Sequence, residues 1–252
     1  MKLSLEGKVA LVTGGSGAIG QQVCLYLNRA GVKVVGATSR FDLETAQVLR
    51  KQAIAVGIEI DVVAFDAADF DDAGRAITEV TNQYGAIDIL VNCAGITRDA
   101  PLRKMTDSQW QQVMGVNLNS MFNSSRHVIE TMAERGWGRI INISSVNGQR
   151  GQFGQTNYSA SKAGVHGFTM ALAQEVARKG VTVNTVAPGY IDSPMIQAVP
   201  ENIRTDILGN IPVGRFGQPR DIAAAVTFLC SPQASFITGA QIPVNGGYYM
   251  GH

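Results

Sequence analysis

Short runs of apolar residues alternate along this chain with longer segments whose apolar residues recur at helical spacing. The runs contain few polar residues, as is typical of parallel strands that helices cover on both faces. They predict strands over 9–13, 32–37, 60–65, 87–91, 138–143, 181–186 and 241–244. The longer segments predict helices over 18–30, 42–56, 69–83, 106–134, 156–179 and 219–230. This repeated order predicts an α/β fold, a Rossmann-type doubly wound parallel sheet of about seven strands with helices on both faces.

Two polar residues and one irregular region refine this prediction. Asp69 and Asp107 precede helical segments and are expected to be N-caps. Residues 190–218 hold three prolines, with a fourth directly after them, and show no clear period, so we expect a flap over a ligand site or an ordinary surface excursion. No repeat or Pro/Ser-rich linker divides the chain, which predicts one domain over residues 1–252.

Composition excludes several classes of protein. The chain has 21 Lys and Arg residues and 20 Asp and Glu residues, which gives a net charge of +1. This balance argues against a nucleic-acid partner bound through a basic surface. The three cysteines and three histidines are scattered, so we expect no metal site. No apolar stretch approaches about 20 residues and the N-terminal residues lack a signal pattern, so we expect a cytoplasmic protein without a membrane partner.

A glycine-rich turn separates the first predicted strand from the first predicted helix. It reads Thr13-Gly14-Gly15-Ser16-Gly17-Ala18-Ile19-Gly20. Glycines allow the backbone to approach a phosphate closely, and the helix N-terminus adds unpaired N–H groups and a positive dipole end. This placement predicts a dinucleotide site, with a tight turn that binds no ligand as the alternative. The residues expected to contact the cofactor here are Gly14, Gly15, Ser16, Gly17, Ile19 and Gly20.

The end of the second strand bears on which dinucleotide binds. An acidic residue about 20 positions after the glycines would bind the ribose 2′-hydroxyl of NAD. This chain has Thr38-Ser39-Arg40 there, so Arg40 could pair with a 2′-phosphate and Ser39 could hydrogen-bond to it. These residues predict NADP(H), although Asp42 competes for the acidic position.

Polar side chains also gather after later strands. Tyr158 and Lys162 are four residues apart, so they share one face of a helix, and a nearby ammonium would lower the pKa of the phenol. Ser144 and Ser145 follow the fifth strand, where a hydroxyl could bind a substrate carbonyl. Asn92-Cys-Ala-Gly95 follows the fourth strand at the same edge of the sheet. Together they predict a catalytic site, whereas a Tyr–Lys pair alone is also common on helix surfaces.

Over essentially its whole length the chain resembles the short-chain dehydrogenase/reductase family. The matching segments are Thr13 to Gly20, Asn92 to Gly95, Asn117, Ser144, Tyr158 to Lys162, and Pro188-Gly189. The chain departs from the family pattern at Ala18, where the family has its middle glycine, and carries Gly17 one place earlier.

The resemblance implies a single dinucleotide-binding oxidoreductase domain with a catalytic tetrad of Asn117, Ser144, Tyr158 and Lys162. It implies that the nicotinamide reduces a carbonyl carbon, Tyr158 donates the proton and Ser144 orients the carbonyl. Lys162 also binds the nicotinamide ribose, and Asn117 holds a water in a proton relay. The further cofactor contacts that it implies are Asp66, Asn92, Ala94, Gly95, Tyr158, Lys162, Pro188, Gly189, Ile191 and Ser193.

A narrower resemblance concerns the substrate. Residues 144–158 are similar to the corresponding segment of acetoacetyl-CoA reductases of polyhydroxybutyrate synthesis, which form (R)-3-hydroxybutyryl-CoA. The substrate residues implied, besides Ser144, are Asp99, Lys104, Gln152, Phe153, Gln155 and Tyr190. Glutamine amides could bind pantetheine amides, aromatic rings could wall a small acyl pocket, and a lysine could meet a phosphate. The alternative is a hydrophilic loop that binds no ligand.

Two other functions remain open at this point. A 3-oxoacyl-acyl-carrier-protein reductase would share fold and chemistry and differ in its acidic carrier. A non-catalytic dinucleotide-binding regulator is disfavoured by the intact Tyr158 and Lys162. Similarity to the family also implies a homotetramer, with the glycine-rich C-terminal segment near a subunit interface.

Overall fold

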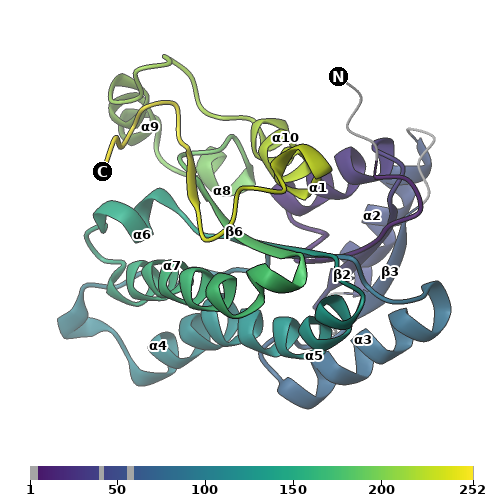
Figure 1. Ribbon diagram of the computed structural model, residues 1–252. Coiled ribbons are helices and arrows are strands. Elements are labelled where there is room, and N and C mark those ends of the chain that lie inside the picture. Colours follow the sequence, from purple (N-terminus) through teal and green to yellow (C-terminus); the bar gives the residue numbers. More distant parts are fainter. Residues whose placement is uncertain (1–4, 40–42, 56–59, 252) are drawn as a thin grey trace.

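The computed structural model describes residues 5–39, 43–55 and 60–251. Seven parallel strands form one sheet in the order β3-β2-β1-β4-β5-β6-β7 (Figure 1). The predicted Rossmann-type sheet is therefore confirmed. The strands are β1 Val9–Thr13, β2 Lys33–Thr38, β3 Asp61–Ala64, β4 Ile89–Asn92, β5 Gly138–Ile143, β6 Val181–Pro188 and β7 Gln241–Val244.

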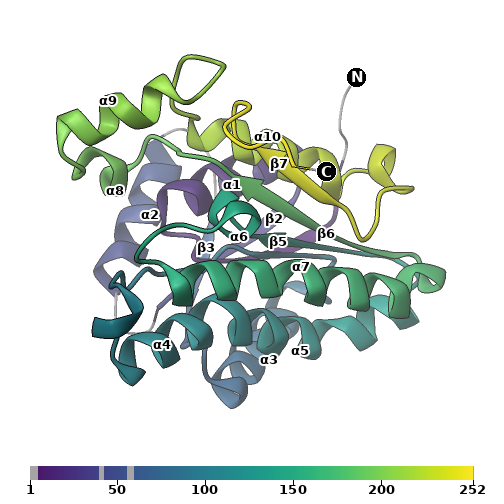
Figure 2. The same ribbon diagram turned by 90° about the vertical axis from the view of Figure 1, so that its left-hand side faces the viewer.

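Helices cover both faces of the sheet. In Figure 2, α1 and α10 lie above the strands, whereas α3, α4, α5 and α7 lie below them. Ala53 of α2 packs into the same core cluster as α1 and α10, which places α2 on their face. The helices are α1 Ala18–Arg29, α2 Leu43–Ala55, α3 Phe70–Tyr84, α4 Asp107–Met114, α5 Ser120–Glu134, α7 Thr156–Val176 and α10 Pro219–Cys230.

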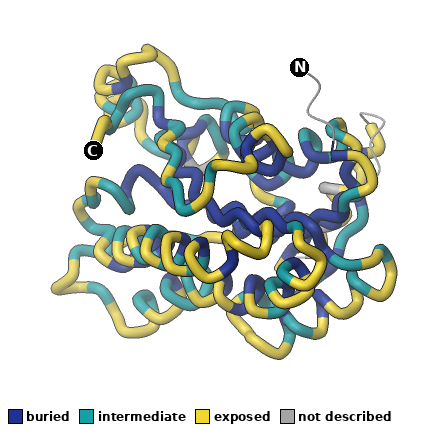
Figure 3. Tube along the Cα trace, viewed as in Figure 1, coloured by how far each residue is buried: buried dark blue, intermediate teal, exposed yellow. Residues whose placement is uncertain are grey.

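The strands are mostly apolar because each face of the sheet has its own core. Within β1, Ala10 and Val12 pack towards α1 and α10, whereas Leu11 packs towards α3, α5 and α7. This alternation follows from the two-residue period of a strand. Figure 3 shows the result, with buried chain along the strands and exposed chain on the outer turns of the helices. Among the described residues, none of the helices has the length and apolar character needed to cross a membrane.

The helix starts agree with the sequence at α3 and differ at α4. Asp69 is the N-cap of α3, where its side chain accepts a hydrogen bond from the Asp72 N–H. At α4 the cap is Thr106, which forms a capping box with Gln109, so the expectation for Asp107 is wrong by one residue. The predicted helix over 106–134 is also interrupted, because a π-helical turn at Gly115–Asn119 separates α4 from α5.

The irregular region 190–218 forms an excursion beyond the end of β6. It contains the short helices α8 Pro194–Gln197 and α9 Glu201–Gly209. Its two ends are joined, since Gly217 N–H donates to the Tyr190 carbonyl at 2.9 Å and Asp192 N–H donates to the Gly217 carbonyl at 2.7 Å. The remaining short elements are η1 Leu102–Lys104, α6 Val146–Arg150, η3 Ala177–Lys179 and η4 Pro232–Ala234.

Candidate active site

A cavity of about 890 Å³ runs along the carboxyl ends of the parallel strands. Residues that follow β1 to β6 form its floor and sides, which is where ligands bind in doubly wound sheets. The excursion adds an apolar wall composed of Ile196, Val199, Ile203 and Ile207. The predicted flap therefore lies beside this cavity, and its two ends are pinned by the hydrogen bonds described above.

The glycine turn at one end of the cavity leaves no room for side chains. Gly14 has φ +64°, and a Cβ there would lie 2.9 Å from the Ala94 backbone. A Cβ on Gly20 would collide with the Gly14 carbonyl oxygen. Gly15 packs on β2, donating its N–H to the Ala37 carbonyl at 2.8 Å, and is absent from the described lining. At Gly14 and Gly20 the turn thus presents backbone to the cavity.

The N-terminus of α1 opens onto the same space. Gly17 is its N-cap, no side chain caps the helix, and its first turn has no acidic residue. Ser16, Gly17, Ala18 and Ile19 all line the cavity. Unsatisfied N–H groups and the positive helix end form a site for an anion, so this end fits a dinucleotide diphosphate. Ala18 does not prevent closure, since Gly17 N–H still donates to the Gly14 carbonyl at 3.0 Å.

The ends of β2 and β3 line the next part of the cavity. Ser39 follows β2, and Asp66 lies just beyond β3, where its Oδ1 accepts from the Ala68 N–H at 3.0 Å. Arg40 and its competitor Asp42 lie outside the described residues. The carboxylates in the described lining are those of Asp66 and Asp99, so the described end of β2 carries none.

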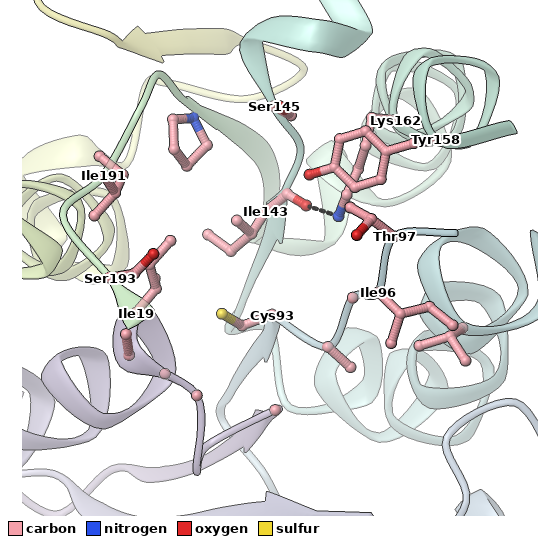
Figure 4. A pocket seen from close by; sticks show the side chains of 18 of the residues that line it. Ile19, Cys93, Ile96, Thr97, Ile143, Ser145, Tyr158, Lys162, Ile191 and Ser193 are labelled. Carbon is pink, nitrogen blue, oxygen red and sulfur yellow. Dashed lines mark hydrogen bonds between the residues drawn. The ribbon is translucent and has the colours of Figure 1, made fainter. Parts of the chain in front are cut away.

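Tyr158 and Ser145 form a hydroxyl pair in the middle of the cavity (Figure 4). The Ser145 hydroxyl lies close enough to the Tyr158 phenol to influence its pKa through hydrogen bonding, and it also caps α6 by accepting from the Asn147 N–H at 3.1 Å. Burial raises the pKa of Tyr158, the hydrogen bond to Ser145 lowers it, and the charge on Asp99 raises it. The net direction is upward, opposite to the shift expected from a neighbouring lysine.

Ser144 points away from this pair. Its Oγ donates to the Lys162 carbonyl at 2.8 Å and lies 3.1 Å from His166 Nε2. Because the single hydroxyl proton is used, Nε2 is the donor in the second bond. The structure therefore places Ser145, and not Ser144, beside Tyr158. The carbonyl-orienting role predicted for Ser144 fits Ser145 instead.

Lys162 is buried one helical turn beyond Tyr158. Its Nζ donates to the Ile143 carbonyl at 2.8 Å and lies 5.9 Å from the centre of the Tyr158 ring (Figure 4). Burial lowers the pKa of Lys162 from 10.5 to about 8, while the nearby Cys93 thiol acts in the opposite direction. A Cβ on Gly95 would lie 3.4 Å from Nζ, so the loop after β4 packs closely on the ammonium.

The two predicted asparagines support the site from outside the described lining. Asn117 lies in the π-helical turn, where its Oδ1 accepts from the Ile96 N–H at 2.8 Å and its Nδ2 donates to the Ile96 carbonyl at 3.0 Å. Asn92 donates to Asn142 Oδ1 at 2.8 Å inside the sheet. The Asn117 side chain thus holds the loop backbone at Ile96, which lines the cavity, whereas the Asn92 side chain bonds to other side chains. Contact of either side chain with a cofactor or a relay water stays a prediction.

The predicted substrate residues divide into two groups. Gln152, Gln155, Asp99 and Tyr190 line the cavity, and Gln155 Nε2 donates to Asp99 Oδ2 at 2.8 Å. Lys104 and Phe153 are exposed and are not part of the described lining. The remaining predicted cofactor residues that line the cavity are Ala94, Gly95, Pro188, Gly189, Ile191 and Ser193.

Sequence reasoning missed several lining residues. They include Cys93, Thr97, Asn147 and the isoleucines of the excursion. Asn147 Nδ2 donates to Gln155 Oε1 at 2.9 Å, which continues the hydrogen-bonded row at the substrate end. A signal for Asn147 existed, because it lies within the segment 144–158 already singled out. The described residues contain no cluster of metal-binding side chains.

Comparison with known proteins identifies the family. Residues 8–204 match the family model described as short chain dehydrogenase. This chain belongs to the short-chain dehydrogenase family. It is thus an oxidoreductase of a family that uses a nicotinamide dinucleotide.

Its relatives cover almost the whole chain. An acetoacetyl-CoA reductase of Allochromatium vinosum is 53% identical over 96% of this chain and 99% of its own length. The acetoacetyl-CoA reductase of Cupriavidus necator is 49% identical over 97% of this chain and 99% of its own length. The 3-oxoacyl-[acyl-carrier-protein] reductase FabG of Pseudomonas aeruginosa is 46% identical over 98% of this chain and 100% of its own length.

Proposed function

We propose that this protein reduces acetoacetyl-CoA to (R)-3-hydroxybutyryl-CoA with NADPH, and that Tyr158 donates the proton. The Tyr158–Ser145 hydroxyl pair beside buried Lys162, open to a cavity of dinucleotide size, is the observation that carries this proposal. The names of the relatives that are 53% and 49% identical support the substrate.

The residues present fit a nicotinamide dinucleotide. The uncapped α1 N-terminus and the glycine turn would hold its diphosphate, and Asp66 would accept from its adenine. The bound cofactor supplies the hydride that reduces the carbonyl carbon. Ser39 and Arg40, together with the absence of a carboxylate at the described end of β2, favour NADPH over NADH.

Side chains of the protein supply the proton and stabilise the charges that form when it is transferred. The raised pKa of Tyr158 keeps its phenol protonated at neutral pH, which is the state that a general acid needs in order to donate a proton to the carbonyl oxygen. Ser145 holds the substrate oxygen next to that phenol as negative charge develops on it. Lys162, still charged below pH about 8, stabilises the phenolate that remains and would bind the nicotinamide ribose.

The carrier of the acyl group is the open choice at the substrate end. The FabG relative favours a 3-oxoacyl-carrier-protein substrate, and the exposed Arg103 and Lys104 of η1 could meet an acidic carrier. The lower identity of that relative and the amide side chains of Gln152 and Gln155 in the lining favour acetoacetyl-CoA. Comparing kcat/KM for acetoacetyl-CoA and for a longer 3-oxoacyl-carrier-protein tests this choice, and a higher value for the carrier protein would reverse it.

We also propose a homotetramer. Phe122 on α5 and Met170 on α7 are about half exposed, at 51% and 52%, and other residues of these helices enclose a small hollow. β7 lies at the edge of the sheet, and Phe236 nearby is fully exposed. Apolar surface and an open strand edge favour self-association. Light scattering on the purified protein should give four times 26.8 kDa, and a monomer would contradict this proposal.

A further inference from the structure

The residues after β7 fold into a compact turn next to the substrate end of the cavity. Asn245 is buried and organises this turn. Its Oδ1 accepts from the Gly247 N–H at 2.9 Å, and its Nδ2 donates to the Tyr249 carbonyl at 2.8 Å. The intervening Tyr248 N–H donates to the Asn245 carbonyl at 3.1 Å. The backbone around Tyr248 is therefore fixed at both ends.

The end of β7 and the C-terminal turn that follows it, residues 245–249, are bonded to the chain on both sides of the excursion over the cavity. Gly189 N–H donates to the Val244 carbonyl at 3.0 Å, just before the excursion begins. Val213 N–H donates to the Gly246 carbonyl at 3.1 Å, near its end. A Cβ on Gly189 would lie 2.8 Å from Asn245, so the two segments are also in close contact. The turn and the loop that carries Tyr190 thus form one packed unit.

Tyr248 uses this placement to contact Tyr190 edge to face. The two ring centres are 5.1 Å apart and the ring planes cross at 87°. On Tyr248 the Arg150 guanidinium also packs, 4.8 Å from the ring centre. Tyr190 lines the cavity, whereas Tyr248 is outside the described lining. Burial, followed by the neighbouring Tyr248, raises the pKa of Tyr190 to about 12.

We propose that Tyr248 is a positioning residue for the thioester substrate, because it holds the Tyr190 ring as a fixed wall of the substrate end. This inference rests on the proposed function, which places the thioester at that end. A phenol ring attached through one loop rotates unless something packs on it, and substrate binding would then have to order the ring. An edge-to-face pair corresponds to about a two- to tenfold change in an equilibrium constant. Loss of Tyr248 should therefore weaken substrate binding by that factor and leave the proton step intact.

Steady-state kinetics of two variants test this inference. Tyr248→Leu removes the ring and keeps apolar bulk, and we expect its KM for acetoacetyl-CoA to rise about three- to tenfold. Its kcat and its Kd for NADPH should stay within about twofold of wild type, a split that general destabilisation would not produce. Tyr248→Phe keeps the ring and should stay within about threefold in KM. Met250→Ala, at a tail residue that is 75% exposed, is the matched control and should change nothing.

A double-mutant cycle shows whether Tyr248 acts through Tyr190. In a Tyr190→Leu background, Tyr248→Leu should add less than about twofold to KM, because the wall is already lost. Equal fold-changes in both backgrounds, or an unchanged KM in Tyr248→Leu, would overturn the inference while wild-type turnover leaves the proposed function standing. If wild type does not turn over acetoacetyl-CoA, the proposed function fails and the inference fails with it. Tyr248→Met replaces Tyr248→Leu should the latter not bind NADPH.

Discussion

Replacing each of the two adjacent serines by alanine separates their roles. Ser145→Ala removes the hydroxyl that lies beside Tyr158, and Ser144→Ala removes the hydroxyl that links the Lys162 carbonyl to His166. The two variants lose the same atoms from positions one residue apart. A difference in kcat between the two variants therefore reflects the position of each hydroxyl, because the chemical change is the same.

The contacts of each serine set the expected magnitudes. Loss of one preorganised donor to a developing oxyanion costs about 2.7–4 kcal/mol, so Ser145→Ala should lower kcat by about 10²- to 10³-fold. It also removes the N-cap of α6, which should cost roughly 1 kcal/mol of stability. Ser144→Ala leaves the half-buried His166 Nε2–H without its acceptor, at about 1 kcal/mol of stability. Its kcat should fall less than about tenfold.

Single-turnover measurement is the suitable assay. Enzyme loaded with NADPH is mixed with excess acetoacetyl-CoA, and the decay of reduced nicotinamide is followed. Urea unfolding of the same two variants gives the change in the free energy of unfolding. A slow Ser144→Ala together with a nearly normal Ser145→Ala would refute the geometry, because the hydroxyl beside Tyr158 would then be the wrong one.

Further predictions concern the acid, the lysine and the cofactor. Tyr158→Phe should reduce turnover at least about 10³-fold while the Kd of NADPH, measured by fluorescence titration, stays within about threefold. Reduction should slow as the pH rises through about 8, where Lys162 loses its proton in the folded protein. Between pH about 8 and 10.5 the unfolded chain keeps the Lys162 proton that the folded protein has lost, so the contribution of Lys162 to the free energy of unfolding rises with pH over this range. A pH profile that stays flat to pH 10 would contradict this role. Gly20→Ala should weaken NADPH binding at least about tenfold, since the added methyl collides with the Gly14 carbonyl, whereas Gly209→Ala, with open space around it, should not. Arg40→Ala should weaken NADPH more than NADH, and an unchanged preference would place the 2′-phosphate elsewhere.

Much of the fold was predictable because a strand that helices cover on both faces must consist mainly of apolar residues. β1, β5 and β7 begin and end at the predicted residues, since each is a short apolar run bounded by turn or polar residues. The π-helical turn at Gly115–Asn119 was not predictable, because a change from four- to five-residue bonding hardly alters the apolar period. The short helices α8 and α9 were not predicted either, because a helix of only one to three turns is too short to show a helical period of apolar residues.

The site was predictable to within one residue at its most important hydroxyl. Side chains alternate along β5, so Asn142 and Ser144 point towards α7, where they bond to Thr169 and to the Lys162 carbonyl. Ser145 is on the opposite parity; both serines line the cavity, but only the Ser144 hydroxyl is bonded to the Lys162 carbonyl. A motif that contains two serines in a row does not carry this information, whereas the alternation that begins within the strand does. The direction of the Tyr158 pKa was missed for a different reason, since the depth of its burial is a tertiary property.

The most direct test of the proposed activity is to mix purified wild-type protein with NADPH and acetoacetyl-CoA and to measure NADPH consumed against 3-hydroxybutyryl-CoA formed. The account predicts one product for each NADPH, of R configuration, with little consumption by Tyr158→Phe. Tight NADPH binding without consumption by the wild type would contradict it and would favour a dinucleotide-binding regulator instead.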